Sequence, residues 1–186
     1  MLNYQIAWRT VQVSGLPKEY HKNIIICDDR SVTAENVAAD AASLIKSEDL
    51  YMIGVDYTNL MVNDEDVSQV TSLFAKLQTL ALKGGGPPVW AFTQLSGQGG
   101  IPRVNNLRWS RMIEAFAGQI FLLYNPQMYG EVDNGSTASI RYQEGRAYII
   151  EGKSKFGYRR GGPGYITVDW DGEKGWGDQS YSWTPL

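Results

Sequence analysis

A carboxylate at the end of an apolar segment has the clearest potential for chemistry in this sequence. Residues 51–56, Tyr-Met-Ile-Gly-Val-Asp, predict a buried strand that ends at Asp56. In nucleotide-hydrolysing α/β proteins an Asp at this position helps to hold Mg²⁺, usually through water. It acts beside a phosphate loop of the form G-x-x-x-x-G-K-[ST], and no segment upstream of Tyr51 has that form. These residues predict the second half of a motor core, cut or separated from the half that grips the nucleotide.

A second segment imitates a phosphate loop. Residues 147–154 fit a relaxed form of the motif, with Ala147 in place of the first glycine. A phosphate loop needs a wrapped backbone that is followed by a helix, whereas Tyr-Ile-Ile at 148–150 favours a strand. The Gly- and Pro-rich residues 155–164 that come next would break a helix. We therefore interpret this segment as a strand that runs into a basic turn.

The composition narrows the class of protein. A length of 186 residues suits one domain with a substantial core, and 20% charged residues is ordinary globular usage. A single cysteine, Cys27, excludes an internal disulfide, and a single histidine, His21, argues against a His-based metal site. No stretch approaches the ~20 apolar residues of a membrane span, and the N-terminus lacks a secretion signal. We expect a cytoplasmic protein without a membrane segment. The net charge of −3 argues against a generally basic surface for nucleic acid, but it allows a local basic patch.

Strand and helix patterns alternate along the chain, after a lead-in at 4–13 that is either a strand or irregular. We expect buried strands at 23–27, 51–56, 88–93 and 119–124. Helices are expected between them, at 34–46, 67–82 and 106–117. This alternation predicts an α/β fold with a parallel sheet and right-handed crossovers. A final antiparallel pair is expected at 145–152 and 164–170, followed by an aromatic tail that packs either on the body or on a neighbour.

Five motifs then occur in a recognisable order. They are Ile-Ile-Ile-Cys-Asp-Asp at 24–29 with Ser-Val-Thr at 31–33, Val-Asp-Tyr-Thr-Asn-Leu-Met at 55–61, Ala-Phe-Thr-Gln-Leu-Ser at 91–96, Leu-Arg-Trp-Ser-Arg-Met-Ile-Glu at 107–114, and Gly-Lys-Ser-Lys-Phe-Gly at 152–157 with Gly-Pro-Gly at 162–164. This order resembles the C-terminal part of the RecA-like motor domain of DnaB-type hexameric replicative DNA helicases, phage versions included. The resemblance covers residues 22–175 and treats 1–186 as a single partial domain. It implies a RecA-like, mostly parallel sheet flanked by helices, with a C-terminal antiparallel strand pair.

The resemblance also implies roles at a nucleotide site for ATP and Mg²⁺. Asp56 would help to coordinate the Mg²⁺ through water, the alternative being a buried or capping Asp at a strand end. Gln94 would be the sensor that links the state of the γ-phosphate to the DNA loops, the alternative being a satisfied polar residue at a strand terminus. Neither alternative requires a ligand.

Basic residues near the end of the chain would act across a subunit interface. The resemblance implies that Lys153 and Lys155 reach the phosphates of a neighbouring subunit, as an arginine finger does. The family usually has Arg where Lys155 stands, and Lys lacks the bidentate fork of Arg. Because the turn is longer than usual for the family, Arg159 or Arg160 could take the role instead. The alternative for all four residues is a solvated basic hairpin.

A glycine-rich loop and the helix after it would face single-stranded DNA. The resemblance implies DNA contacts for the loop 98–103, which ends at Arg103, and for Arg108, Trp109 and Arg111. Backbone N–H groups and Arg side chains can hold phosphates without reading bases, and an indole can stack on a base. The alternative for Trp109 is packing of the helix.

From these features we expect a fragment of a helicase that couples ATP hydrolysis to translocation on single-stranded DNA, as a homo-hexamer in its full-length context. The fragment alone is expected to be inactive as an ATPase, because it lacks the phosphate loop and the catalytic Glu of the family. Two other classes stay open. One is a complete, non-catalytic RecA-like module for DNA binding or assembly, and the other is a different RecA-like ATPase of the circadian-clock or recombinase kind. An upstream phosphate loop would favour the helicase, and a natural start at Met1 would favour the module.

Overall fold

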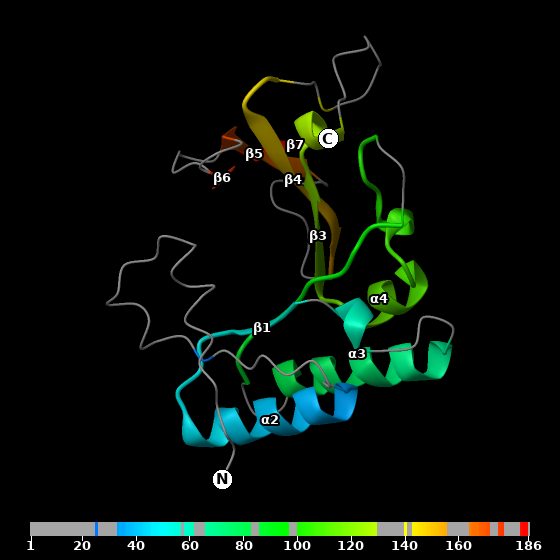
Figure 1. Cartoon of the computed structure of the whole chain (residues 1–186), viewed down its shortest axis with the longest axis vertical. Helices are drawn as coiled ribbons and strands as arrows, with labels where there is room; N and C mark the ends of the chain where they lie inside the picture. Colours follow the sequence, from blue (N-terminus) through cyan, green and yellow to red (C-terminus); the bar gives the residue numbers. More distant parts are fainter. Residues whose placement is uncertain are drawn as a thin grey trace. The chain divides into compact units, whose positions relative to one another are not determined.

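The computed structural model describes residues 25, 33–56, 58–61, 66–82, 86–96, 100–129, 140, 143–155, 164–171, 175–176 and 183–185. The chain divides into two compact units, Met1–Thr33 and Ala34–Leu186. Only Ile25 and Thr33 of the first unit are described, so the predicted strand at 23–27 and the lead-in at 4–13 lie outside the described residues. The elements that follow belong to the second unit (Figure 1), and the interpretation of the whole chain as one domain stays a prediction.

Two helices form where hydrophobic residues recur at helical spacing. α2 spans Ala34–Ser47 and α3 spans Val67–Leu82, in agreement with the predicted ranges. Buried side chains occupy one face of α3, namely Val70, Leu73, Phe74 and Leu77. The two helices lie side by side (Figure 1), so this apolar face contributes to a shared core.

A short parallel pair confirms the predicted pairing of the strand that ends at Asp56. β1 (Ile53–Val55) pairs in parallel with β2 (Val89–Ala91), and Val55 lies opposite Ala91. Both strands are shorter than the predicted ranges 51–56 and 88–93. Val55 is buried, which anchors the pair to the core.

The second sheet is antiparallel. β3 (Gln119–Tyr124) pairs with β4 (Arg146–Ser154), and β4 pairs with β5 (Gly164–Asp171), which confirms the predicted antiparallel final pair. Two short strands of the tail, β6 (Gly175–Trp176) and β7 (Trp183–Pro185), also pair with β5. These parts of the tail therefore pair with the body of the chain.

The position of β3 differs from the expected fourth parallel strand. Among the described residues, β3 pairs with β4 and with no other strand, and the pairing is antiparallel. Apolar side chains face one another across this ladder, with Leu122 opposite Ile150 and Tyr124 opposite Tyr148. All four are buried, and such cross-strand pairs stabilise an antiparallel partner that local sequence cannot reveal.

The predicted helix at 106–117 is divided into two elements. A single 3₁₀ turn, η4, spans Val104–Asn106, and the helix α4 spans only Ser110–Phe116. Between them Leu107 is extended (ψ 132°), buried, and joined to Leu95 by an isolated antiparallel bridge. Trp109 adopts the left-handed conformation (φ 59°) and starts α4. Tertiary burial of Leu107 thus interrupts a segment whose apolar spacing alone favours one helix.

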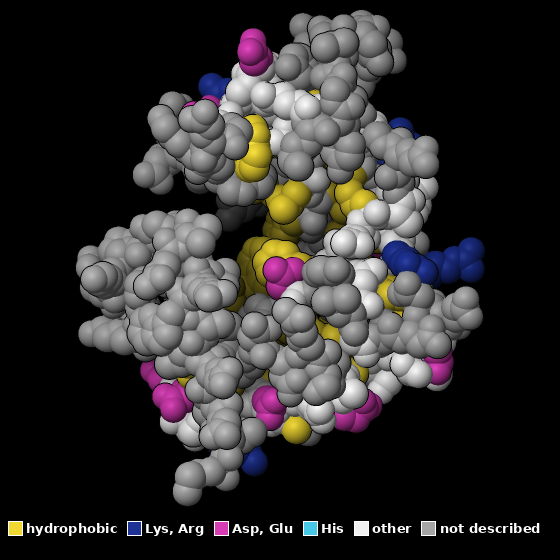
Figure 2. All heavy atoms as spheres, in the orientation of Figure 1, with side chains coloured by type: hydrophobic (Ala, Val, Ile, Leu, Met, Phe, Trp, Pro, Cys, Tyr) yellow, Lys and Arg dark blue, Asp and Glu magenta, His cyan; other side chains and the backbone are white. Residues whose placement is uncertain are grey.

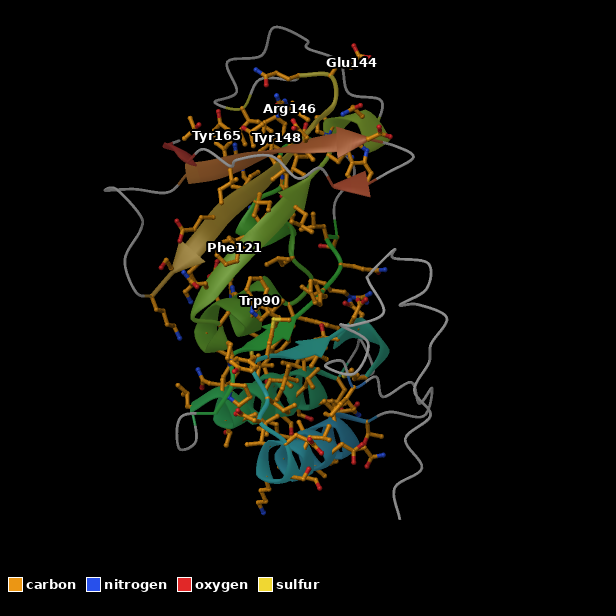
Figure 3. All side chains as sticks on the ribbon, turned by 90° about the vertical axis from the view of Figure 1, so that its left-hand side faces the viewer. Trp90, Phe121, Glu144, Arg146, Tyr148 and Tyr165 are labelled. Atoms are coloured by element: carbon orange, nitrogen blue, oxygen red, sulfur yellow. The ribbon has the colours of Figure 1, made fainter. Side chains whose placement is uncertain are left out.

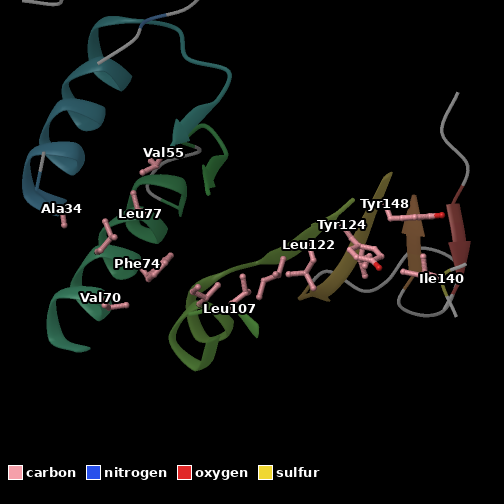
Figure 4. Packing of buried hydrophobic residues seen from close by; sticks show 14 residues of the cluster. Ala34, Val55, Val70, Phe74, Leu77, Leu107, Leu122, Tyr124, Ile140 and Tyr148 are labelled. Carbon is pink, nitrogen blue, oxygen red and sulfur yellow. The ribbon is translucent and has the colours of Figure 1, made fainter. Parts of the chain in front are cut away.

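One hydrophobic core connects the helices with the antiparallel sheet (Figure 4). It extends from Val70 and Phe74 of α3 through Leu107 to Leu122 and Tyr148. None of the helices in the described part of the chain combines the length and apolar character that a membrane crossing needs.

Aromatic side chains also link the two sheets. Trp90 of β2 stacks on Phe121 of β3, with ring centroids 5.9 Å apart and an interplanar angle of 12° (Figure 3). Both rings are partly exposed, Trp90 by 46% and Phe121 by 37%. Figure 2 shows hydrophobic side chains at the surface near the middle of the face that it draws.

Candidate functional site

The C-terminal ends of β1 and β2 bring two predicted site residues to the same edge. Val55 lies opposite Ala91, and the N–H of Phe92 donates a 2.9 Å hydrogen bond to the carbonyl oxygen of Val55. Asp56 therefore leaves β1 beside Phe92, and Gln94 follows two residues later. Asp56 is exposed, so the alternative of a buried aspartate does not describe it, and Gln94 is exposed as well. This edge presents a carboxylate and an amide to solvent.

A 3₁₀ turn that begins two residues after Asp56 holds this edge of the sheet in place. The turn, η2, spans Thr58–Leu60, and Thr58 is fully buried. Thr58 donates twice to the carbonyl oxygen of Phe92, from its N–H at 2.9 Å and from its Oγ1 at 3.2 Å. The buried hydroxyl thus has a partner, and the chain after β1 is fixed to the chain after β2.

Asn59 is a site residue whose role was missed from the sequence. Its Oδ1 accepts hydrogen bonds from Thr93 Oγ1 at 3.0 Å and from the N–H of Gln94 at 3.2 Å. Both bonds reach across more than 30 positions of sequence, so no local pattern marks Asn59 for this role. The side chain of Asn59 positions the backbone of Gln94.

The edge suits an outer-shell role toward magnesium. In phosphate sites Mg²⁺ keeps several waters and takes one or two carboxylates besides the phosphates of the substrate. Asp56 offers one exposed carboxylate at the end of a buried strand. The described residues contain no group of three or more His, Cys, Asp and Glu side chains that could hold a metal. A single exposed carboxylate is compatible with contact to a hydrated cation through water.

Lys153 and Lys155 lie at the C-terminal end of α4. Lys153 Nζ donates to the carbonyl oxygen of Glu114, and Lys155 Nζ donates to that of Ala115 at 2.8 Å. The N–H of Lys155 also donates to the carbonyl oxygen of Gly118 at 2.8 Å. Both lysines are thus hydrogen-bonded to α4, and Lys155 is also exposed to solvent. Arg159 and Arg160 lie outside the described residues.

The predicted DNA-binding residues surround η4 and the start of α4. Arg103, Arg108 and Arg111 are exposed, and the N–H of Arg103 donates to Asn106 Oδ1 at 2.8 Å. The guanidinium of Arg108 lies over the indole of Trp109, 5.5 Å from the ring centroid. Trp109 is partly buried against the core, so the alternative of helix packing applies to part of its surface. One segment therefore carries three exposed cations and one half-buried indole.

The chain after Gln94 is joined directly to this basic segment. Leu95 and Leu107 form the antiparallel bridge, and Ser96 donates to the carbonyl oxygen of Asn106 from its N–H at 2.6 Å and from its Oγ at 2.9 Å. The bridged pair of Leu95 and Leu107 therefore lies between Gln94 and Arg108.

Comparison with known proteins places this geometry in context. The sequence matches the family of the DnaB-like helicase C terminal domain over residues 4–174. One similar solved structure is a DnaB-like replicative helicase studied with its interactions with primase, at 19% identity and a TM-score of 0.60. A second is the ATPase domain of another protein, at 18% identity and a TM-score of 0.62. No curated protein sequence is significantly similar to the chain.

The two structural matches establish the fold and its extent. They cover 81% and 96% of this chain, so the predicted RecA-like α/β architecture is confirmed. In the other direction the chain spans 35% of the DnaB-like helicase and 64% of the second protein's ATPase domain. The chain thus corresponds to part of each of these proteins.

Proposed function

The chain belongs to the family of DnaB-like helicase C-terminal domains, and we propose that it is the part of a replicative DNA helicase that couples ATP hydrolysis to movement along single-stranded DNA. The observation that carries this proposal is a continuous connection within the site. Asp56 and Gln94 share one edge, and the bridge from Leu95 to Leu107 links that edge to the basic segment. A motor requires such a connection between its nucleotide and its track.

At the nucleotide, the proposed roles follow from position. Bound Mg²⁺ would neutralise charge on the phosphates, and Asp56 would hold and orient its water ligands. Gln94 would hydrogen-bond to the γ-phosphate or to water near it, with its backbone held by Asn59. Loss of the γ-phosphate would remove this hydrogen-bond partner of Gln94. The backbone between Gln94 and Ser96 would then change position.

At the DNA, the proposed contacts are electrostatic. Arg103, Arg108 and Arg111 would bind phosphates, and the exposed part of Trp109 would stack on a base. In a homo-hexameric ring each subunit would supply these few contacts, and Lys153 and Lys155 would serve the nucleotide of a neighbour. We place this activity in the cytoplasm. ATP turnover would need a phosphate loop that this sequence does not contain.

Fluorescence anisotropy of the purified chain on labelled single-stranded DNA tests the proposal. We expect weak, sequence-independent binding that falls steeply with salt. Arg108→Ala and Arg111→Ala should each weaken binding, and Trp109→Ala should cost ~1–3 kcal/mol if the indole stacks on a base. Unchanged binding in all three variants would move the DNA site elsewhere.

An ATPase assay separates the helicase from the other classes. The chain alone should bind ATP weakly and should not hydrolyse it. When a protein combines this chain with a phosphate loop, DNA-stimulated hydrolysis should appear and Asp56→Ala should abolish it. DNA binding without hydrolysis in that combined protein would instead favour the non-catalytic module.

A further inference from the structure

The C-terminal end of α4 has an unusual set of hydrogen-bond donors. A helix leaves its last four carbonyl groups without intrahelical partners, and these need other donors. In α4 the first receives a backbone N–H and the other three receive side chains. The pairs are Ala117 N–H to Ile113 (2.8 Å), Lys153 Nζ to Glu114, Lys155 Nζ to Ala115 (2.8 Å) and Gln78 Nε2 to Phe116 (2.8 Å). Two of these four partners are the lysines proposed to act on a neighbour.

α4 depends on such external support. It has seven residues, and isolated helices of this length are not stable in water. Its first turn starts from Trp109 in the left-handed conformation, which is strained for a residue with a Cβ, and no side chain caps that end by a hydrogen bond. Cations beside the last turn are favourable because the carbonyl end of a helix carries partial negative charge. The lysines therefore contribute to keeping α4 folded.

An ammonium group has three N–H donors, and each lysine uses one of them on a carbonyl oxygen of α4. A phosphate carries full negative charge, whereas a helix carbonyl end carries only partial negative charge, so the phosphates of a neighbour's nucleotide would attract both ammonium groups more strongly. A lysine side chain that extends toward such a phosphate would leave the carbonyl group of Glu114 or Ala115. Arg108 and Arg111 lie at the opposite end of the same short helix.

We propose that Lys153 and Lys155 form a latch on α4. When they bind its C-terminal carbonyl groups, the helix is ordered and its basic start is positioned for DNA. When they bind phosphates from a neighbouring subunit, the end of α4 is released and the DNA contacts weaken. The DNA and nucleotide halves of this inference rest on the proposed function, whereas the latch itself lies within one chain.

Amide hydrogen exchange of the whole chain tests the latch without DNA or nucleotide. In the double variant Lys153→Met, Lys155→Met, exchange over residues 110–118 should rise roughly three- to tenfold, as expected for the loss of two favourable charges at a helix end. Exchange over β5 serves as the internal reference for global stability. Lys46→Met, in the last turn of α2, is the matched control for loss of a lysine and should leave α4 unchanged. Unchanged exchange of α4 in the double variant overturns the latch.

Two further readouts separate positioning from a purely structural role. Lys153→Arg with Lys155→Arg keeps both donors and should restore slow exchange and DNA affinity together. Inorganic tripolyphosphate, as a probe for a neighbour's phosphates, should speed the exchange of α4 in the wild type but not in the Met variant. No response in the wild type overturns the release step. Faster exchange in the Met variant, with DNA affinity equal to that of Lys46→Met, would keep the latch but would refute α4 as the DNA-binding element.

Discussion

Asn59 Oδ1 accepts a hydrogen bond from the backbone N–H of Gln94 at 3.2 Å, across 35 positions of sequence. The same oxygen accepts a bond from Thr93 Oγ1, so one amide oxygen holds two consecutive residues at the end of β2. Asn59 follows Asp56 by three positions, so these bonds tie the chain after Asp56 to the backbone of Gln94, in addition to the two bonds from Thr58 to Phe92.

This support can be measured by a double-mutant cycle on the isolated chain. Asn59→Ala and Thr93→Val each remove one partner of the hydrogen bond between the two side chains. We expect each to lower the free energy of unfolding, with a coupling energy of ~0.5–1.5 kcal/mol in urea titrations. Asn59→Asp retains an acceptor and should lose less. Additive effects in the cycle would mean that Thr93 and Asn59 do not stabilise one another.

Gly152 allows β4 to approach the basic segment closely. A Cβ at this position would stand 2.6 Å from Cγ2 of Val104 and 3.3 Å from Cδ1 of Leu122. Gly152→Ala should therefore destabilise the chain by ~1–3 kcal/mol through overpacking, and it should weaken DNA binding by displacing η4. Val104→Ala removes the clashing methyl groups, so the double variant should recover stability. If the double variant denatures at the same temperature as Gly152→Ala alone, the contact with Val104 is not the cause of the lost stability.

The carboxyl group of Asp66, at the start of α3, predicts that the stability of the chain depends on pH. A hydrogen bond from the hydroxyl of Ser68, assisted by the N–H of Gln69, lowers the pKa of the Asp66 carboxyl below its ordinary value. A pKa lowered by folding means that the folded state favours the carboxylate. The resulting stability is complete above the ordinary pKa of Asp, about 3.9, and is lost as the pH falls through the lower folded-state value.

Asp66→Asn separates this charge effect from capping. Asn is also a good N-cap but does not titrate. The wild type should melt at a higher temperature than the variant near pH 6, and the difference should shrink as the pH falls to about 3 or below. A difference in melting temperature that stays constant over this range would assign the effect to the shape of the side chain.

In the complete ring, Lys155→Ala should abolish ATP hydrolysis while sparing nucleotide binding, because the lysine is proposed to act on a neighbour's phosphates. Mixing this variant with one that lacks a working phosphate loop should restore part of the activity. Some interfaces in the mixture would pair an intact loop with an intact Lys155. If the mixture stays inactive, the action in trans is refuted and Arg159 or Arg160 becomes the next candidate.

Local sequence patterns are sufficient to predict the helices and the strand that leads to Asp56. Five apolar residues at helical spacing, followed by glycines, are enough to predict α3 over 67–82, because a helix is built from contacts three and four residues apart. The apolar run before Asp56 predicts β1, the alternation of strands and helices predicts a parallel sheet, and the order of the motifs predicts the family. The roles of Asp56, Gln94 and the basic residues stay predictions that rest on this order.

Tertiary structure alone decided which distant groups meet. The antiparallel pairing of β3 depends on the apolar face that β4 presents to it, and the break at Leu107 depends on its burial beside Leu95. Lys155 contacts Ala115 across 40 positions of sequence, although nothing near either residue marks the other as its partner. A long flexible side chain reaches many places, and only the register of β3 with β4 brings its ammonium group to the end of α4. Such contacts are set by the path of the whole chain, which local spacing does not encode.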